Sequence, residues 1–501
     1  MYKAAGRFIL NRLLYKIAGG EPMANDRRLT EGNPFTALLR FSLPFLLSNI
    51  LQACYGASDL FMVGRFSDSI GVSAVATGGQ VMQTITGLSI GLTTGGTVLI
   101  GRYFGARQKQ DIAHAVKTMV AVFGAMSLLL TAGTLLLLDP VCSLMQVPSS
   151  ALEATRQYLS VCACGILFIV GYNVVSGILR GLGDSRTPLI LITVSCVINV
   201  STDLLFVGVL RMGAFGAAVS TVIAQIIGLL LAVIYLGCKG LLRRYRRCEP
   251  CFRLYAAKGV LAAGLPIALQ EGLVNVSYLV LTAMINSLGL IASASVGVVE
   301  KLIVFSMLPT TAFSAALSAM TAQHYGAGLM NRARHCMRLS VGLSLVFGIG
   351  CLLLSQWNAP AMVGLFTGDP QVVAQGALYL RSYSLDCVLV CFVFCMNAFF
   401  SGGGHTLFPL IHSLVSTCLV RIPLSWLLIH AARPSMLYIG FAAPAASFLS
   451  MLLCQWFISV HYPKQKRAAG RSFILPGAAR NPAAKLSAQH NRLKLYSRFQ
   501  K

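Results

Sequence analysis

Four polar residues stand in stretches of the chain that are otherwise apolar, and their side chains are of the kinds that bind small cations. Asp59, Asn199, Asp203 and Thr221 offer carboxylate, amide and hydroxyl oxygens. Asn199 and Asp203 are four residues apart, a spacing that places both side chains on one face of a helix. We interpret the four residues as a candidate functional site within the membrane, and we expect Asp59 and Asp203 to lie near each other.

Each carboxylate also has a structural interpretation. Asp203 falls near the end of an apolar stretch, where water could solvate it. Asp59 comes shortly before Gly64-Arg65, and its side chain could snorkel to the outer surface. An ionisable group in a bilayer costs at least about 2.5–3.5 kcal/mol, which favours a functional role for a buried carboxylate. Burial and a second carboxylate nearby both favour the protonated form, which makes proton coupling feasible.

The chain repeats itself at an interval of 221 or 222 residues. Leu43-Pro44 returns as Leu265-Pro266, and Tyr158-Leu159 returns as Tyr379-Leu380. A repeat of this length in an apolar chain is typical of secondary transporters built from two similar halves. Proline removes a backbone hydrogen bond from a helix, so we interpret Pro44 as a hinge in the first helix.

The repeat provides an internal test of the polar residues. The second copy has Leu281 where the first has the Asp of its first helix. It has Val420 and Leu424 where the first has the Asn and the Asp of its fifth helix. The symmetry of the fold therefore does not require polar side chains at these positions, which favours a role in function.

The second half carries charges of its own at other positions. Glu271, Glu300 and Asp386 are acidic residues in apolar stretches, and Lys301 and Arg421 are basic ones. Glu271, Glu300, Lys301 and Asp386 are candidates for a second cation or substrate site in this half. The alternative is that Lys301 or Arg421 neutralises a carboxylate structurally.

The composition predicts an all-α integral membrane protein. Hydrophobic residues make up 56% of the 501 positions and charged residues 11%, too few charges to cover a soluble protein of this size. A helix needs about 20 apolar residues to span a bilayer. Twelve stretches meet that length, at 36–63, 71–99, 112–138, 157–178, 188–209, 214–237, 258–285, 290–321, 336–357, 378–400, 406–430 and 437–461. Six fall in each half, which predicts two pseudo-symmetric six-helix lobes with the same orientation.

The positions of Lys and Arg predict the orientation in the membrane. With the N-terminus in the cytoplasm, the inside segments hold 33 of the 40 Lys and Arg residues and the outside loops hold three. We therefore expect both termini in the cytoplasm. The net charge of +25 then reflects orientation and contact with anionic lipid, and nucleic-acid binding is excluded.

These patterns divide the chain into five segments. They are a basic cytoplasmic N-terminal segment at 1–35, a six-helix lobe at 36–237, a basic cytoplasmic linker at 238–257, a second six-helix lobe at 258–461 and a disordered basic cytoplasmic tail at 462–501. Met23 is a candidate for the true start of translation.

Motifs for enzymatic chemistry are missing. The sequence has no Walker A motif and no His-Glu-x-x-His motif. Cys248 and Cys251 form one CxxC pair without a second pair near it, which argues against zinc. We expect no enzyme activity, no metal and no cofactor apart from the coupling H⁺ or Na⁺.

The segment 177–188, Gly-Ile-Leu-Arg-Gly-Leu-Gly-Asp-Ser-Arg-Thr-Pro, lies between the fourth and fifth predicted helices. With the twelve-helix plan, the Phe-Gly-Ala at 104–106 and the Val-Arg-Ile-Pro at 420–423, it resembles the multidrug and toxic compound extrusion (MATE) transporters. The prokaryotic DinF-like branch is the most similar. The second copy of the junction is degraded to Ser-Gly-Gly-Gly-His at 401–405, which puts its cytoplasmic contacts in doubt.

The resemblance implies antiport of organic cations or other amphipathic compounds outward against inward H⁺ or Na⁺, by a monomer in the bilayer. It also implies that Asp59, Asn199, Asp203 and Thr221 hold the coupling ion, and that the helix at Pro44 bends. A flippase for a lipid-linked oligosaccharide or polysaccharide precursor is the alternative. The basic residues placed to hold its diphosphate would be Lys301, Arg381 and Arg421.

Overall fold

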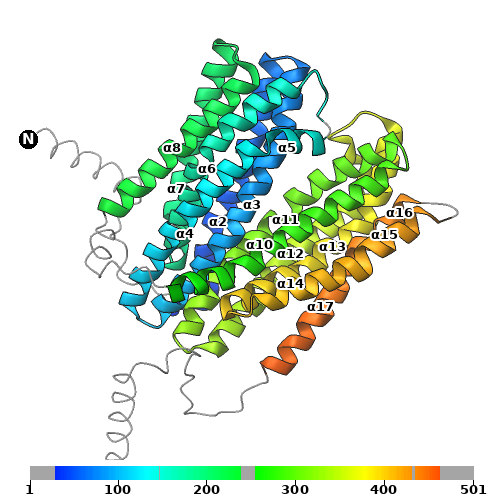
Figure 1. The fold of residues 1–501 in the computed structure, drawn as a ribbon. Helices are drawn as coiled ribbons and strands as arrows, with labels where there is room; N and C mark the ends of the chain where they lie inside the picture. The colour runs from blue at the N-terminus through cyan, green and yellow to red at the C-terminus, as the bar shows by residue number, and fades with distance from the viewer. Residues whose placement is uncertain (1–28, 146, 239–253, 432–434, 463–501) are drawn as a thin grey trace, which may run out of the picture. The chain divides into compact units, whose positions relative to one another are not determined.

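A computed structural model describes residues 29–145, 147–238, 254–431 and 435–462 of the chain (Figure 1). Within these ranges, twelve helices are long and apolar enough to cross a membrane, which confirms the predicted all-α fold and its twelve spans. The proposed start at Met23, the CxxC pair, and most of the N-terminal segment, the linker and the tail lie outside the described residues.

The first half of the chain forms one group of helices, drawn from blue to green in Figure 1. Its members are α2 (Pro34–Phe66), α3 (Ser69–Gly105), α4 (Lys109–Leu136), α5 (Leu138–Leu144), α6 (Leu152–Gly181), α7 (Arg186–Asp203) and α8 (Gly213–Cys238). A π-helical segment, η1 (Leu204–Val209), continues α7. Helix α6 is central to the group and packs against α3, α4 and α8.

The second half forms a matching group, drawn from green to orange. Its members are α10 (Leu254–Asn286), α11 (Leu290–Gly326), α12 (Met330–Gly364), α13 (Pro370–Gly403), α14 (Leu407–Ser416), α15 (Ile422–Ile429), α16 (Met436–Ile439) and α17 (Ala442–His461). The π-helical segment η2 (Thr417–Arg421) joins α14 to α15. Helix α13, the repeat counterpart of α6, packs against α11, α12 and α16.

Local sequence signals set the ends of several helices. Asn33 accepts a hydrogen bond from the backbone of the helix that it caps, and Asp369 does the same for α13. Proline follows each cap, where its fixed φ suits the first turn of a helix. Gly183 and Gly404 follow α6 and α13 with φ of 90° and 83°, a conformation that favours glycine. The two repeats thus end their central helices in the same way.

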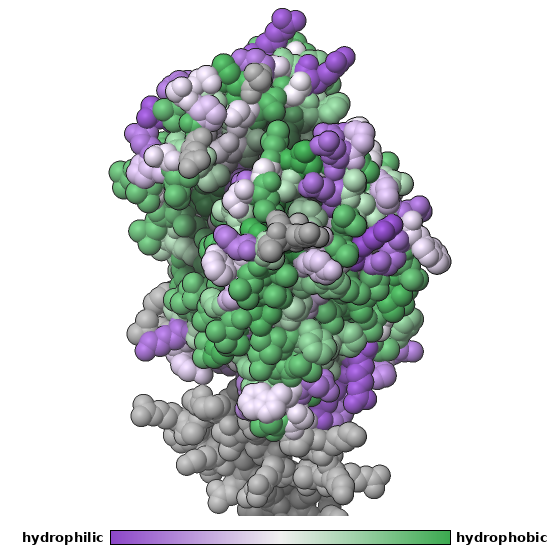
Figure 2. Space-filling model, turned by 90° about the vertical axis from the view of Figure 1, so that its right-hand side faces the viewer, coloured by the Kyte–Doolittle hydropathy of each residue, from purple (hydrophilic) through white to green (hydrophobic). Residues whose placement is uncertain are grey.

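The outer surface is apolar over much of its area. Figure 2 shows hydrophobic residues across the middle of one face and hydrophilic residues mainly towards its ends. Several large apolar side chains are almost fully exposed, among them Leu136 (82%), Leu365 (81%) and Trp357 (79%). A soluble monomer does not expose this much apolar surface, so the helices are suited to face lipid.

Glycines allow the two groups of helices to approach closely. A Cβ atom at Gly95 of α3 would collide with the backbone of Gly264 in α10. Near the end of α3, a Cβ at Gly105 would collide with the backbone of Gln323 in α11. A Cβ at Gly326 would in turn meet the backbone of Arg102. The helices α3 and α11 therefore cross in direct backbone contact at the end of the molecule that carries these residues.

Two hydrogen bonds related by the repeat join the groups at the same end. Arg102 Nε donates to the Gly402 carbonyl (3.4 Å), and Gln323 Nε2 donates to the Gly181 carbonyl (3.0 Å). Arg102 corresponds to Gln323 in the repeat, and Gly181 corresponds to Gly402. The degraded junction at 401–405 therefore keeps its contact with the other group, because a backbone carbonyl makes it and no particular side chain is needed.

Candidate cation-binding site

Asp59 lies deep within the first group of helices. Its side chain is 5% exposed on α2. Thr221 Oγ1 of α8 donates a hydrogen bond to Asp59 Oδ2 (2.9 Å), whereas Oδ1 has no hydrogen-bond partner. Snorkelling to the surface does not occur in this structure.

Asn199 and Asp203 lie one turn apart on α7, and both are fully buried. Both are close enough to Asp59 to interact with its carboxylate. Neither the amide of Asn199 nor the carboxylate of Asp203 makes a hydrogen bond of good geometry. The structure thus gathers the four predicted residues from α2, α7 and α8 in one place, and solvation of Asp203 at a helix end does not occur.

The site lies where α7 becomes π-helical. Asp203 is the last residue of α7 and η1 begins directly after it. Short π-helical segments often occur at functional sites, because the extra residue changes the direction of neighbouring side chains. The sequence predicts a regular helix here, and the structure differs because a π-helical turn has no clear sequence signal.

Two further polar residues border the site and were not identified from the sequence. Tyr55 OH donates to the Thr221 carbonyl (3.2 Å) and interacts with both carboxylates. Ser220 of α8 lies next to Asp203. Tyr55 precedes Asp59 by four residues, so the spacing on one helix face could have identified it.

The charges of the two carboxylates decide what this site can bind. Neither Asp59 nor Asp203 forms an ion pair with a Lys or Arg of the described residues, whereas Arg156 pairs with Asp139. Two carboxylates that share a buried site cannot both stay charged unless a cation binds between them, and without such a cation one of them takes up a proton. No three His, Cys, Asp or Glu side chains of the described chain gather as a divalent metal site would need. The donor set, two carboxylates with amide and hydroxyl oxygens, therefore suits a proton or a monovalent cation.

Pro44 lies inside α2, fifteen residues before Asp59. The helix continues through the proline, and Ser48 Oγ donates to the Pro44 carbonyl (2.8 Å). Fifteen helical residues span about 22 Å, so a bend at Pro44 would change the direction of the segment that carries Asp59. Its role as a hinge stays a prediction.

The second group of helices has a charged cluster of its own. Arg421, at the end of η2, is 9% exposed, and its guanidinium lies 4.1 Å from the centre of the Tyr278 ring. Asp386 of α13, 4% exposed, interacts with Arg421 electrostatically. Glu300 of α11 interacts with both Arg421 and Lys301. Arg421 thus lies within electrostatic range of both carboxylates, and Lys301 lies within range of Glu300.

Glu271 stands apart from that cluster. It is exposed on α10, and the structure gives it no hydrogen bond or ion pair with another described residue. Its neighbour Gly272 faces Leu88 of α3. Of the four candidates for a second site, Glu300 and Asp386 therefore share Arg421 as a neighbour, Lys301 lies beside Glu300, and Glu271 lies outside this cluster.

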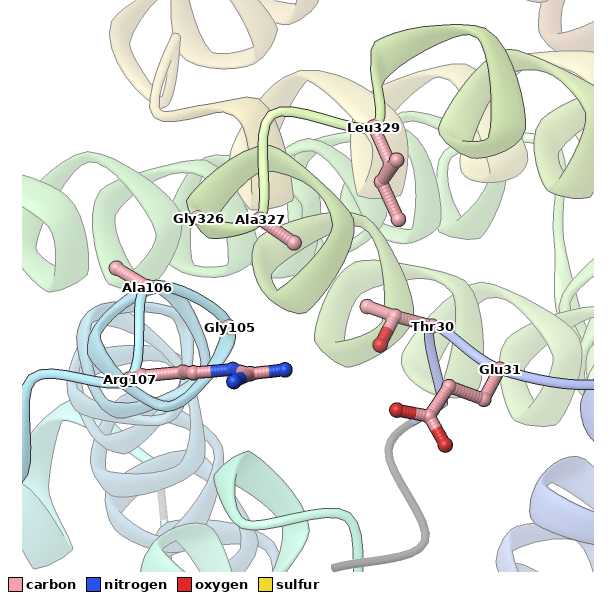
Figure 3. Close-up of a pocket in the computed structure, with 8 residues that line it drawn as sticks. All are labelled: Thr30, Glu31, Gly105, Ala106, Arg107, Gly326, Ala327 and Leu329. Carbon is pink, nitrogen blue, oxygen red and sulfur yellow. The ribbon is translucent and has the colours of Figure 1, made fainter. Parts of the chain in front are cut away.

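A pocket of about 390 Å³ lies at the end of the molecule where α3 and α11 cross. It is lined by Thr30, Glu31, Gly105, Ala106, Arg107, Gly326, Ala327 and Leu329. Figure 3 shows the side chains of Arg107 and Glu31 extending into the space between them. None of the predicted site residues lines this pocket, so we do not identify it with the cation site.

Twelve membrane-length helices in two repeated groups are the architecture of a multi-pass membrane transporter. The MatE family model matches residues 44–205 and 266–427, two equal segments that begin at the repeated prolines. The chain therefore belongs to the MatE family, as the sequence predicted, and it is a transporter and not an enzyme.

Known relatives agree with this assignment. The probable multidrug resistance protein YpnP of Bacillus subtilis is 28% identical over 79% of this chain and 88% of its own length. The probable multidrug resistance protein NorM of Thermotoga maritima is 26% identical over 85% of this chain and 93% of its own. A solved MATE transporter in an outward-facing conformation has 22% identity, a TM-score of 0.79, and coverage of 86% of this chain and 97% of that one.

Proposed function

We propose that this transporter exports organic cations or other amphipathic compounds in exchange for inward H⁺ or Na⁺. The observation that carries the proposal is the pair of buried carboxylates, Asp59 and Asp203, which form no ion pair with a Lys or Arg of the described chain. A mobile cation can complete such a site, and binding and release of that cation can drive a change of conformation. The names of the relatives, which include multidrug resistance proteins, support the substrate class.

Each residue of the site has a chemical role in this scheme. Asp59 and Asp203 bind the cation, and Asn199 and Thr221 supply neutral oxygens. When the cation neutralises the carboxylates, the attraction for a positively charged substrate falls. The α2 segment beyond Pro44 then bends, and the substrate leaves towards the outside.

The rest of the fold supports alternating access. The contacts at Gly105 and Gly326 and the hydrogen bonds of Arg102 and Gln323 close one end between the groups of helices. The distribution of basic residues assigns that end to the cytoplasm. Both termini are then cytoplasmic, the membrane is the bacterial inner membrane, and one chain holds a complete site, so a monomer suffices.

Efflux measurements test the proposal directly. Ethidium transport is measured in proteoliposomes with a pH gradient or a sodium gradient imposed separately, for the wild type, Asp59→Asn and Asp203→Asn. We expect the gradient-driven rate of each variant to fall about tenfold or more, because a neutral amide cannot bind a proton or balance the charge of Na⁺ as a carboxylate does. The gradient that drives the wild type identifies the coupling ion.

Glu153→Gln is the matched control, since it removes one carboxylate near the surface end of α6. It should transport at the wild-type rate. Wild-type transport by Asp59→Asn and Asp203→Asn would show that these carboxylates do not couple transport to a cation.

A further inference from the structure

The second group of helices also holds two carboxylates in its interior, but the environment of those carboxylates differs. Asp386 is 4% exposed and Glu300 is partly buried. Arg421 lies within electrostatic range of both, and Lys301 lies beside Glu300. These carboxylates therefore have basic groups near them, whereas no described Lys or Arg forms an ion pair with Asp59 or Asp203.

Aromatic side chains fix Arg421 in place. Its guanidinium stacks over the Tyr278 ring at 4.1 Å, a favourable geometry for a cation. Tyr278 OH lies 3.1 Å from Tyr383 OH, which is supplied by α13. Tyr379, also of α13, interacts with Arg421, Glu300 and Asp386. Three helical elements thus hold the charge of Arg421 at one position.

The cluster keeps unused hydrogen-bonding capacity. Oδ1 of Asp386, Oε1 of Glu300, and Nε and Nη2 of Arg421 have no hydrogen-bond partner, although all are buried. No direct ion pair of 4.0 Å or less joins Arg421 to either carboxylate in the described part of the chain. Arg421 therefore acts on the carboxylates through space and not through a direct ion pair, and their free oxygens stay able to bind a cation if Arg421 is removed.

We propose that Arg421 is a resident cation that takes, in the second group of helices, the place that a mobile H⁺ or Na⁺ takes in the first. The second group then binds no coupling ion, and Arg421 limits cation binding to the site of Asp59 and Asp203. The inference extends the proposed function, but its test compares variants that lack the first site and so does not depend on that function.

Cation binding by purified protein tests the proposal. In an Asp59→Asn/Asp203→Asn background, bound ²²Na⁺ is counted at saturation, and proton uptake between about pH 8.5 and pH 5.5 is counted by titration. We expect Arg421→Met in this background to take up about one more Na⁺ or H⁺ per molecule than the background itself. The two measurements distinguish which of the two ions binds.

Two controls define the result. Arg421→Lys keeps the charge and should add no cation. Arg381→Met removes an exposed arginine from the same group of helices and should also add none. Equal cation uptake by Arg421→Met and Arg421→Lys would overturn the proposal.

If Arg421→Met is too unstable for cation counting, a comparison with a double variant tests the same proposal. Arg421→Met/Asp386→Asn restores the charge balance, so it should melt at a higher temperature than Arg421→Met and should lose the additional cation. If Asp386→Asn neither raises the melting temperature of Arg421→Met nor removes its additional cation, the interaction between Arg421 and Asp386 does not stabilise this cluster.

Discussion

The two groups of helices share a backbone plan, but they differ in how their buried carboxylates are neutralised. In the first group, Asp59 and Asp203 have hydroxyl and amide neighbours and no basic partner among the residues that the structure describes. In the second, Arg421 lies within range of Asp386 and Glu300. A repeat can thus supply the same scaffold twice and use it for different purposes. In the proposed scheme, the first group responds to ion binding, and the second group already contains a basic residue beside its carboxylates.

The repeat locates this difference in single residues. Arg421 corresponds to Val200 of the first group, and Asp386 corresponds to Gly165. Ser447 of α17 interacts with Asp386, much as Thr221 of α8 donates to Asp59. The second cluster is therefore built in the interior of its own group from helix positions other than those used in the first.

Removing one acidic group from each cluster should have opposite effects on stability. Asp386→Asn removes the electrostatic interaction between Asp386 and Arg421. Two charges 4 Å apart interact by about 4 kcal/mol at an effective dielectric constant of 20, and this pair is further apart, so we expect a loss of about 2 kcal/mol. Asp59→Asn removes an uncompensated carboxylate and should cause no loss, or a gain of up to about 1 kcal/mol.

Thermal unfolding of purified Asp386→Asn and Asp59→Asn in detergent measures the two changes in stability. Asp386→Glu keeps the charge and is the control for side-chain replacement at that position. If Asp59→Asn and Asp386→Asn lower the unfolding temperature equally, the two clusters are not electrostatically different.

The twelve spans could be predicted from the sequence because hydrophobicity over about 20 residues defines a membrane helix. The grouping of Asp59, Asn199 and Asp203 could also be predicted, since helical spacing and the comparison of repeats both indicated it. The short helix α5 and the π-helical segments η1 and η2 could not. They depend on local backbone geometry, for which the sequence carries no strong signal.

The proximity of basic and acidic side chains in the second cluster was harder to predict from the sequence. The repeat comparison found apolar residues at Leu281, Val420 and Leu424 and so showed no counterpart of the first site. It could not show that Arg421 meets Asp386 and Glu300, because the three lie on different helical elements and none aligns with a residue of the first site. Only the packing of α11, α13 and η2 brings them into range of one another.

Placing a resident cation in the first group should convert it to the state of the second. Val200, the counterpart of Arg421, lies next to Asn199 and three residues before Asp203 on α7, so a long basic side chain there can reach the carboxylate. We expect Val200→Arg to lose about tenfold or more of gradient-driven ethidium efflux, because the Arg would satisfy the carboxylates permanently.

Val200→Met is the control, since it adds similar bulk without charge and should transport at close to the wild-type rate. Ethidium binding by the purified variants shows that each is folded. Efflux by Val200→Arg at the rate of Val200→Met would mean that a fixed charge beside Asp203 does not replace the mobile cation.

The smallest predicted effect concerns a position where the two repeats differ in backbone strain. Arg107 follows α3 with φ of 61°, and its counterpart Gly328 follows α11 with φ of 75°. An L-residue in this conformation costs about 1 kcal/mol relative to glycine. Arg107→Gly should therefore stabilise the protein by about 1 kcal/mol, and Gly328→Arg should destabilise it by a similar amount. Thermal unfolding measures the change in stability of both variants.

Arg107→Ala is the control for loss of the side chain, because alanine keeps the backbone strain. If Arg107→Ala stabilises the protein as much as Arg107→Gly, the side chain of Arg107 and not its backbone conformation lowers the stability, and the repeats do not differ in backbone strain.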